Sequence, residues 1–201
     1  MKTSDAAKGD FATMGLVALG ANLPSGGFPP DLSVPRAMAR LAEVLGGDVS
    51  ASRLYHTPAF PAGSGPQFVN AAMRVAWRGD PEDLLAVLHG IEAEFGRTRA
   101  HRWEARVMDL DLIAFGDAVL PDAATRAEWA GLPPDVAATV VPDRLIVPHP
   151  RLAERAFVLV PLADVAPDWV EPTSGRSVRQ MLAALPEADL AGVRPFDGAG
   201  G

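Results

Sequence analysis

The stretch FVNAAMRVAWRGDPEDLLAVLHGIEAEFG, residues 68–96, shows two hydrophobic periods in succession. Residues 68–77 alternate between an apolar face and a mixed face, which predicts a strand. Residues 81–95 place apolar side chains at helical spacing, and Asp80 with Pro81 is typical of a helix start. A strand that turns directly into an amphipathic helix indicates a domain built from both kinds of element.

The flanking sequence extends this alternation. An apolar strand is expected at 13–20, a helix at 31–45 and a second long strand at 107–115. Further short elements are expected as strands at 145–147 and 157–160 and as a helix at 177–185. The order β-α-β-β-α-β predicts an α+β, ferredoxin-like domain: an antiparallel sheet with helices on one face and the active site on the other.

The domain organisation is simple. Residues 1–12 are expected to form a loose N-terminal tail, and residues 13–201 a single domain. Residues 120–143 are rich in proline and alanine without a clear period, which predicts an insertion on the surface.

Composition limits the functional classes. The chain has 201 residues, no cysteine and a net charge of −7, which excludes disulfides and zinc-thiolate sites and makes nucleic acid and anionic membranes poor partners. Its two lysines, Lys2 and Lys8, lie in the tail, so no Gly-Lys phosphate loop is present. No apolar run is long enough to span a bilayer and no secretory signal is evident, so we expect a cytoplasmic protein.

Two carboxylates mark the strand at 107–115. Asp109 and Asp111 are two residues apart, so their side chains should project side by side from one face. Like charges so close favour a bound cation, and Mg²⁺ suits carboxylate and phosphate oxygens. The alternative is a solvated acidic face whose carboxylates pair with nearby arginines.

An arginine-rich loop precedes that strand. Arg97, Arg99, Arg102 and Arg106 come within ten residues, together with Trp103. Guanidinium groups bind phosphate oxygens in a forked geometry, and a cationic loop beside a metal-type carboxylate pair is typical of polyphosphate transfer. The alternative is a solvated basic loop.

Other candidate residues are ambiguous by themselves. Phe68 and Asn70 share a strand face and could stack on and read a flat heterocycle, or Phe68 could fill a minor core. Phe157 has the same ambiguity. His149 lies between two prolines and could hold a phosphate, although a loop histidine can equally be structural. Glu92 falls at the edge of the buried face of its predicted helix, which is unusual for a carboxylate.

Taken together, these segments resemble the 6-hydroxymethyl-7,8-dihydropterin pyrophosphokinase family of folate biosynthesis. The Arg-Trp-x-x-Arg-x-x-Asp-x-Asp pattern and the Pro-His-Pro-Arg-Leu segment are its most specific motifs. The matching stretches are ALGANL (18–23), YHTPAF (55–60), FVNAAM (68–73), IEAEFGRTRAHRWEARVMDLDLIAFGD (91–117) and VPHPRLAERAFVLVPLADVAP (147–167).

The resemblance implies transfer of the β,γ-diphosphoryl group of MgATP to the pterin hydroxymethyl group, with release of AMP. It implies two Mg²⁺ ions, with ATP and 6-hydroxymethyl-7,8-dihydropterin as the small-molecule partners, and we expect a monomer. No dedicated base is expected, because little proton transfer precedes a loose transition state, but Asp109 is expected to assist the hydroxyl.

The resemblance also implies residue roles. The catalytic group would be Arg97, Arg106, Asp109 and Asp111, with both aspartates as metal ligands. The ATP group would be Glu92, Arg99, Arg102, Trp103, Arg144, His149 and Arg155. The pterin group would be Thr57, Pro58, Phe60, Phe68, Asn70 and Phe157.

The chain departs from the family in one motif. The usual Trp-Gly-Pro-Arg is Trp103-Glu104-Ala105-Arg106 here, which leaves open how Arg99 and Arg102 divide their roles.

Two other function classes stay open from the residues alone. A ferredoxin-like module that binds RNA or a small effector would use Phe68, and another metal-dependent phosphoryl enzyme would use the aspartates. The net charge of −7 argues against the RNA-binding module. The other phosphoryl enzyme would give no role to the paired aromatics, Phe68 and Phe157.

Overall fold

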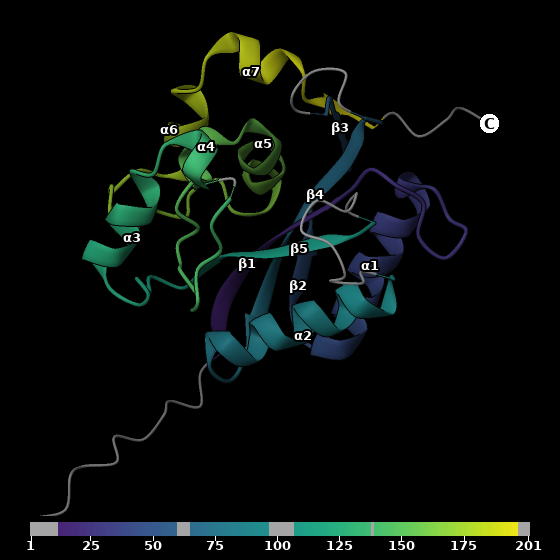
Figure 1. Ribbon diagram of the computed structural model, residues 1–201. Coiled ribbons are helices and arrows are strands. Elements are labelled where there is room, and N and C mark those ends of the chain that lie inside the picture. Colours follow the sequence, from purple (N-terminus) through teal and green to yellow (C-terminus); the bar gives the residue numbers. More distant parts are fainter. Residues whose placement is uncertain (1–11, 60–64, 97–106, 138, 197–201) are drawn as a thin grey trace, which may run out of the picture.

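The computed structural model describes residues 12–59, 65–96, 107–137 and 139–196, and a six-stranded sheet lies at the centre of these segments (Figure 1). The sheet order is β5-β1-β4-β3-β6, with β2 also on β4, and every pair is antiparallel. The strands are β1 (Thr13–Ala21), β2 (Val49–Ala51), β3 (Tyr55–Thr57), β4 (Phe68–Trp77), β5 (Asp109–Phe115) and β6 (Arg194–Pro195). The α+β class is therefore confirmed.

Two helices cover one face of the sheet, α1 (Pro30–Leu45) and α2 (Pro81–Glu94), as Figure 1 shows. Their apolar stripes, which include Leu41, Leu84 and Leu88, are fully buried against alternate residues of β1, β4 and β5. The predicted strand at 68–77 and the helix after it are confirmed. The positions between these core residues must point to the opposite face of the sheet.

The opposite face is also partly covered by helices, so the expectation of helices on one face alone is wrong. Helix α5 (Ala156–Val165) packs on it and α6 (Val178–Ala183) packs on α5, and both contribute to a second buried core with strand residues such as Leu16 and Ala72. Those strand positions are apolar, so they need cover too. Toward one end of this face, polar residues such as Asn70 and Asp109 take the place of these apolar residues.

Two predicted short strands are wrong. Residues 157–160 belong to helix α5. A short apolar run fits either a strand or a helix, and here Val158 and Leu159 are buried in a helix that packs between the sheet and α6. Residues 145–147 form no strand, although Val147 makes a single bridge with Leu120.

Strand β5 contains an irregularity that changes its faces. Leu16 pairs with Ala114 and Val17 with Leu112, so Ile113 is an extra residue. The expected alternation holds for Asp109 and Asp111 but reverses afterwards: Ala114 belongs to the second core and Phe115 to the first.

The remaining elements surround the α5 side. Residues 120–143, the predicted insertion, carry α3 (Ala123–Ala130) and α4 (Pro134–Ala137), and η1 (Leu152–Glu154) precedes α5. Helix α7 (Glu187–Ala191) leads to β6, which pairs with β3 at the sheet edge. The predicted helix at 177–185 is confirmed as α6. None of the described helices is long and apolar enough to cross a membrane.

Candidate active site

The candidate site begins where one residue of β1 separates two predicted site residues. Gly20 pairs with Asn70 on β4 and with Asp109 on β5. Because neighbouring strands lie about 4.8 Å apart, the Asn70 and Asp109 backbones are about 10 Å apart. A side chain at Gly20 would collide with Asn70, since its Cβ would lie 2.8 Å from Asn70 Oδ1. Glycine therefore keeps open the gap between the predicted pterin and metal residues.

The predicted pterin residues on β3 and β4 touch one another. Asn70 Nδ2 donates to Thr57 Oγ1 at 2.7 Å, and both side chains are buried. Thr57 pairs with Phe68 in the sheet, where Phe68 is half-buried. The hydrogen bond fixes the amide, so that Asn70 Oδ1 is directed at Gly20 and can accept a hydrogen bond there.

A second aromatic comes from a different element. Phe157 lies in the first turn of α5 and is 41% exposed, which is unusual for a phenylalanine. The Arg155 guanidinium carbon lies 5.6 Å from the centre of its ring. One predicted pterin residue and one predicted ATP residue are thus brought together.

The donor set on β5 fits Mg²⁺. Asp109 and Asp111 are half-buried and point away from the α1 and α2 core, in which Leu110 between them is buried. Within the described segments, no group of three or more metal-binding side chains occurs. Two hard carboxylates suit a magnesium ion that takes its other oxygens from phosphate and water.

Glu92, on helix α2, holds this strand by a hydrogen bond from the α2 face of the sheet. The Glu92 side chain is 1% exposed, and its Oε1 accepts the backbone N–H of Leu110 at 2.8 Å. Its carboxylate therefore ties α2 to β5 between the two aspartates. The residue predicted to contact ATP holds the metal-type strand in place, a function that its position at the edge of the helix stripe did not reveal.

His149 sits beside this strand with its ring orientation fixed. Its backbone N–H donates to Ile113 O at 2.8 Å, and its Nδ1 accepts the Arg151 N–H at 3.1 Å. Burial, together with the Arg155 guanidinium, lowers the pKa of His149 to about 3, and nearby Asp109 opposes that change. The ring is therefore neutral at pH 7 with its proton on Nε2, which can donate to an anionic ligand.

Other predicted residues are not brought to this cluster. Arg144 is exposed and pairs with Asp143 at 3.2 Å. The remaining predictions fall on residues outside the described segments, namely Arg97, Arg99, Arg102, Trp103, Arg106 and Phe60.

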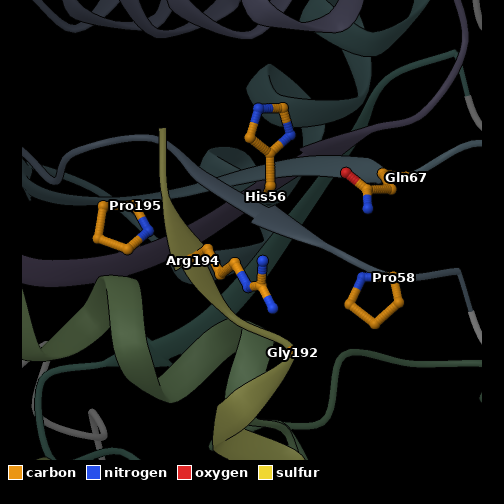
Figure 2. Close-up of a pocket in the computed structure, with 6 residues that line it drawn as sticks. All are labelled: His56, Pro58, Gln67, Gly192, Arg194 and Pro195. Atoms are coloured by element: carbon orange, nitrogen blue, oxygen red, sulfur yellow. The ribbon is translucent and has the colours of Figure 1, made fainter. Parts of the chain in front are cut away.

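A cavity of about 560 Å³ lies at the sheet edge where β3 and β6 pair. Figure 2 shows the lining residues, which come from β3 and its following loop, from the segment before β4 and from the C-terminal segment: His56, Pro58, Gln67, Gly192, Arg194 and Pro195. Of these, sequence reasoning named Pro58 alone. A Cβ on Gly192 would lie 3.1 Å from Pro58, so the C-terminal segment packs directly on the predicted pterin loop. Neither the cavity lining nor the packing of Gly192 on Pro58 is indicated by a pattern in the local sequence.

Comparison with known proteins gives a consistent result. Residues 16–167 match the family model described as 7,8-dihydro-6-hydroxymethylpterin-pyrophosphokinase. A Pseudomonas aeruginosa protein named 2-amino-4-hydroxy-6-hydroxymethyldihydropteridine pyrophosphokinase is 38% identical over 173 residues, covering 85% of this chain and 90% of that protein. A Synechocystis protein of the same name is 36% identical over 168 residues, covering 83% and 73% respectively.

Solved structures agree on the fold. The crystal structure of Plasmodium falciparum HPPK-DHPS matches with a TM-score of 0.57 at 15% identity and covers 86% of this chain. The match spans 44% of that longer chain. At this identity the likeness concerns the fold alone.

Proposed function

The chain belongs to the 7,8-dihydro-6-hydroxymethylpterin-pyrophosphokinase family, and on that basis we propose which of its residues carry the reaction. It is a transferase of folate biosynthesis that moves the pyrophosphoryl group of ATP to the hydroxymethyl group of 6-hydroxymethyl-7,8-dihydropterin. The residue assignments below are our proposals for this chain.

The pterin would bind over the Gly20 end of the sheet. Phe68 and Phe157 supply the aromatic faces for stacking, and the exposure of Phe157 supports its role. Thr57 and Asn70 would read the edge of the heterocycle, with Asn70 Oδ1 accepting a hydrogen bond. Pro58 and Phe60 would close the same side.

The phosphates would bind beside it on β5. Asp109 and Asp111 would hold two Mg²⁺ ions, which, when bound, neutralise the polyphosphate charge. The arginines Arg97, Arg99, Arg102 and Arg106, with Trp103, are proposed to bind ATP from the preceding loop. His149 Nε2, Arg155 and Arg144 would bind the nucleotide, and Glu92 would act through Leu110.

The bond changes follow from this placement. The pterin hydroxymethyl oxygen attacks the β-phosphorus of ATP, the bond from that phosphorus to the α,β-bridging oxygen breaks, and AMP leaves. Asp109 accepts a hydrogen bond from the attacking hydroxyl, whose proton passes to the carboxylate or to water. Removal of Asp109 should therefore cost more turnover than removal of one stacking ring.

Finer features of the fold and its state are also proposals. The order β5-β1-β4-β3, with a helix after β1 and another after β4, supports a ferredoxin-like core. A monomer in the cytoplasm, without nucleic acid or membrane partners, is proposed from composition and charge.

One observation carries the proposal most directly: Gly20 stands between Asn70 and Asp109, so the proposed pterin and phosphate residues lie on the two strands that flank β1, on one sheet face. The test is nucleotide product analysis with ATP, Mg²⁺ and 6-hydroxymethyl-7,8-dihydropterin, using Asp111→Ala for comparison. AMP that depends on both pterin and Asp111 would support it. ADP would indicate an ordinary kinase, and AMP without pterin a hydrolase; either would overturn it.

A further inference from the structure

The peptide unit between Pro148 and His149 is held from both sides. Its N–H donates to the Ile113 carbonyl of β5 at 2.8 Å. Its carbonyl, on Pro148, accepts from Arg126 Nε at 3.3 Å. Because the amide is planar, these two bonds fix its orientation, and with it the Cα position of His149.

The second of these bonds comes from the insertion. Arg126 lies on α3, which begins at Asp122, whose side chain accepts the Thr125 N–H at 2.9 Å. The insertion is attached close by, since Leu120 and Val147 exchange backbone hydrogen bonds of 2.8 and 3.2 Å. A helix without fully buried residues therefore places one guanidinium against the histidine segment.

Arg126 is itself held by a buried acceptor. Its Nη1 donates to Thr173 Oγ1 at 2.8 Å, and its Nη2 lies 3.6 Å from Glu171 Oε1. The side chains of Arg126 and Glu171 are 13% and 3% exposed. This pair is therefore well shielded from solvent, unlike the chain's exposed ion pairs.

Glu171 is built to stay charged. It accepts the backbone N–H of Thr173 at 3.0 Å, that of Ser174 at 2.7 Å and the Thr173 hydroxyl at 2.7 Å. Burial raises its pKa, but the hydrogen bonds from Ser174 and Thr173 outweigh burial and lower it. A fixed anion thus orients the guanidinium, which in turn reaches Pro148.

We propose that Arg126 is a positioning residue for the nucleotide side: anchored by Glu171 and Thr173, it clamps the Pro148–His149 peptide and sets where the His149 ring meets the ligand. This inference rests on the proposed function, in which His149 binds the nucleotide. The proposal also assigns a role to residues 120–143, because this segment supplies the Arg126 guanidinium.

The test compares Arg126→Met with Arg126→Lys and with Arg179→Met as a matched control. Arg179 forms an exposed ion pair at 3.1 Å with a different carboxylate, that of Asp168. Binding of α,β-methylene-ATP with Mg²⁺ is measured by calorimetry, and KM is measured for each substrate. We expect Arg126→Met to weaken analogue binding and raise the ATP KM about tenfold, equivalent to about 1.4 kcal/mol, with the pterin KM changed less than twofold.

The lysine variant protects the test against misfolding. Lysine keeps a cation beside Glu171 but lacks the planar fork that reaches Glu171 and Pro148 together. The Arg126→Lys protein should keep the wild-type melting temperature within a few degrees and still bind ATP more weakly than the wild-type protein. If both variants fold and the ATP KM is unchanged, or if both substrates' KM values rise equally, the positioning role is wrong.

A readout without turnover separates this inference from the proposed function. The chain has four histidines, so the imidazole proton–carbon NMR spectrum is simple. Without nucleotide, the His149 resonance should move in Arg126→Met and stay in Arg179→Met. An unmoved resonance would overturn the clamp even if the enzyme is active. A moved resonance in a protein that makes no AMP would instead overturn the proposed function and leave the clamp standing.

Discussion

Asn70 and Asp109 face each other across Gly20, each paired with that glycine in the sheet. The two side chains belong to strands that are not neighbours, and the missing Cβ between them leaves the space above β1 open. The sheet itself therefore aligns the amide proposed to read the heterocycle with a carboxylate proposed to bind metal, and we propose that the two substrates meet in the gap between them.

Gly20→Ala should damage pterin recognition first. The added methyl would lie 2.8 Å from Asn70 Oδ1, so the amide must turn and its bond to Thr57 must weaken. We expect the pterin KM to rise about tenfold and the free energy of unfolding to fall by about 1–3 kcal/mol. Steady-state kinetics and urea unfolding measure these. Gly90→Ala is the control, because a Cβ there meets nothing within 4 Å.

Asp111→Asn should separate metal binding from folding. It removes one of two adjacent like charges on β5, so the free energy of unfolding without Mg²⁺ should not fall. The stabilisation of the wild-type protein by Mg²⁺ with α,β-methylene-ATP should be lost, as should at least about 99% of turnover. Thermal melting with and without Mg²⁺ and the analogue measures the loss of stabilisation. Asp117→Asn, an exposed carboxylate just after β5, should keep both properties.

Glu92→Ala should loosen β5 between the aspartates. It leaves the buried Leu110 N–H without its 2.8 Å acceptor, which costs about 1–3 kcal/mol of stability. Turnover should fall as well, because Asp109 and Asp111 flank Leu110. Glu92→Gln keeps an acceptor oxygen and should recover most of both losses. Glu94, also on α2, forms an exposed ion pair with Arg40 of α1, so Glu94→Ala should leave the free energy of unfolding nearly unchanged.

Much of the fold followed from local sequence. The alternation of residues 68–77 and the apolar stripe after Pro81 predicted β4 and α2 nearly to the residue, because each element buries one regular face. The prediction for residues 157–160 was wrong, since so short an apolar run has no period that distinguishes a strand from a helix. The reversal after Ile113 also escaped prediction, because an extra strand residue shows itself only against its partner strand.

The site residues, like the fold, were predictable where the local sequence carries a pattern and not where tertiary packing decides. Asn70, Asp109 and Asp111 were predicted from residue type and position, and Thr57 from the family resemblance; in the structure they lie at one end of the sheet. Gly20 and Arg126 were not predicted as site residues. Gly20 matters through what its absent side chain leaves free, and Arg126 through a carbonyl 22 residues away in the chain. Contacts of this kind arise from tertiary packing and leave no pattern in the local sequence.

His149 should make the protein acid-sensitive. Its pKa is about 3 in the folded protein against an ordinary 6.5, so between these values the unfolded chain binds a proton that the folded protein does not. Stability from the neutral ring is complete above pH 6.5 and is lost as the pH falls toward 3. His149→Asn cannot ionise but still offers Arg151 an acceptor. Relative to this variant, the wild-type protein should lose at most about 2 kcal/mol between pH 7 and pH 5. Urea unfolding of both proteins at the two pH values measures the difference, and parallel losses in the two would show that His149 titrates normally.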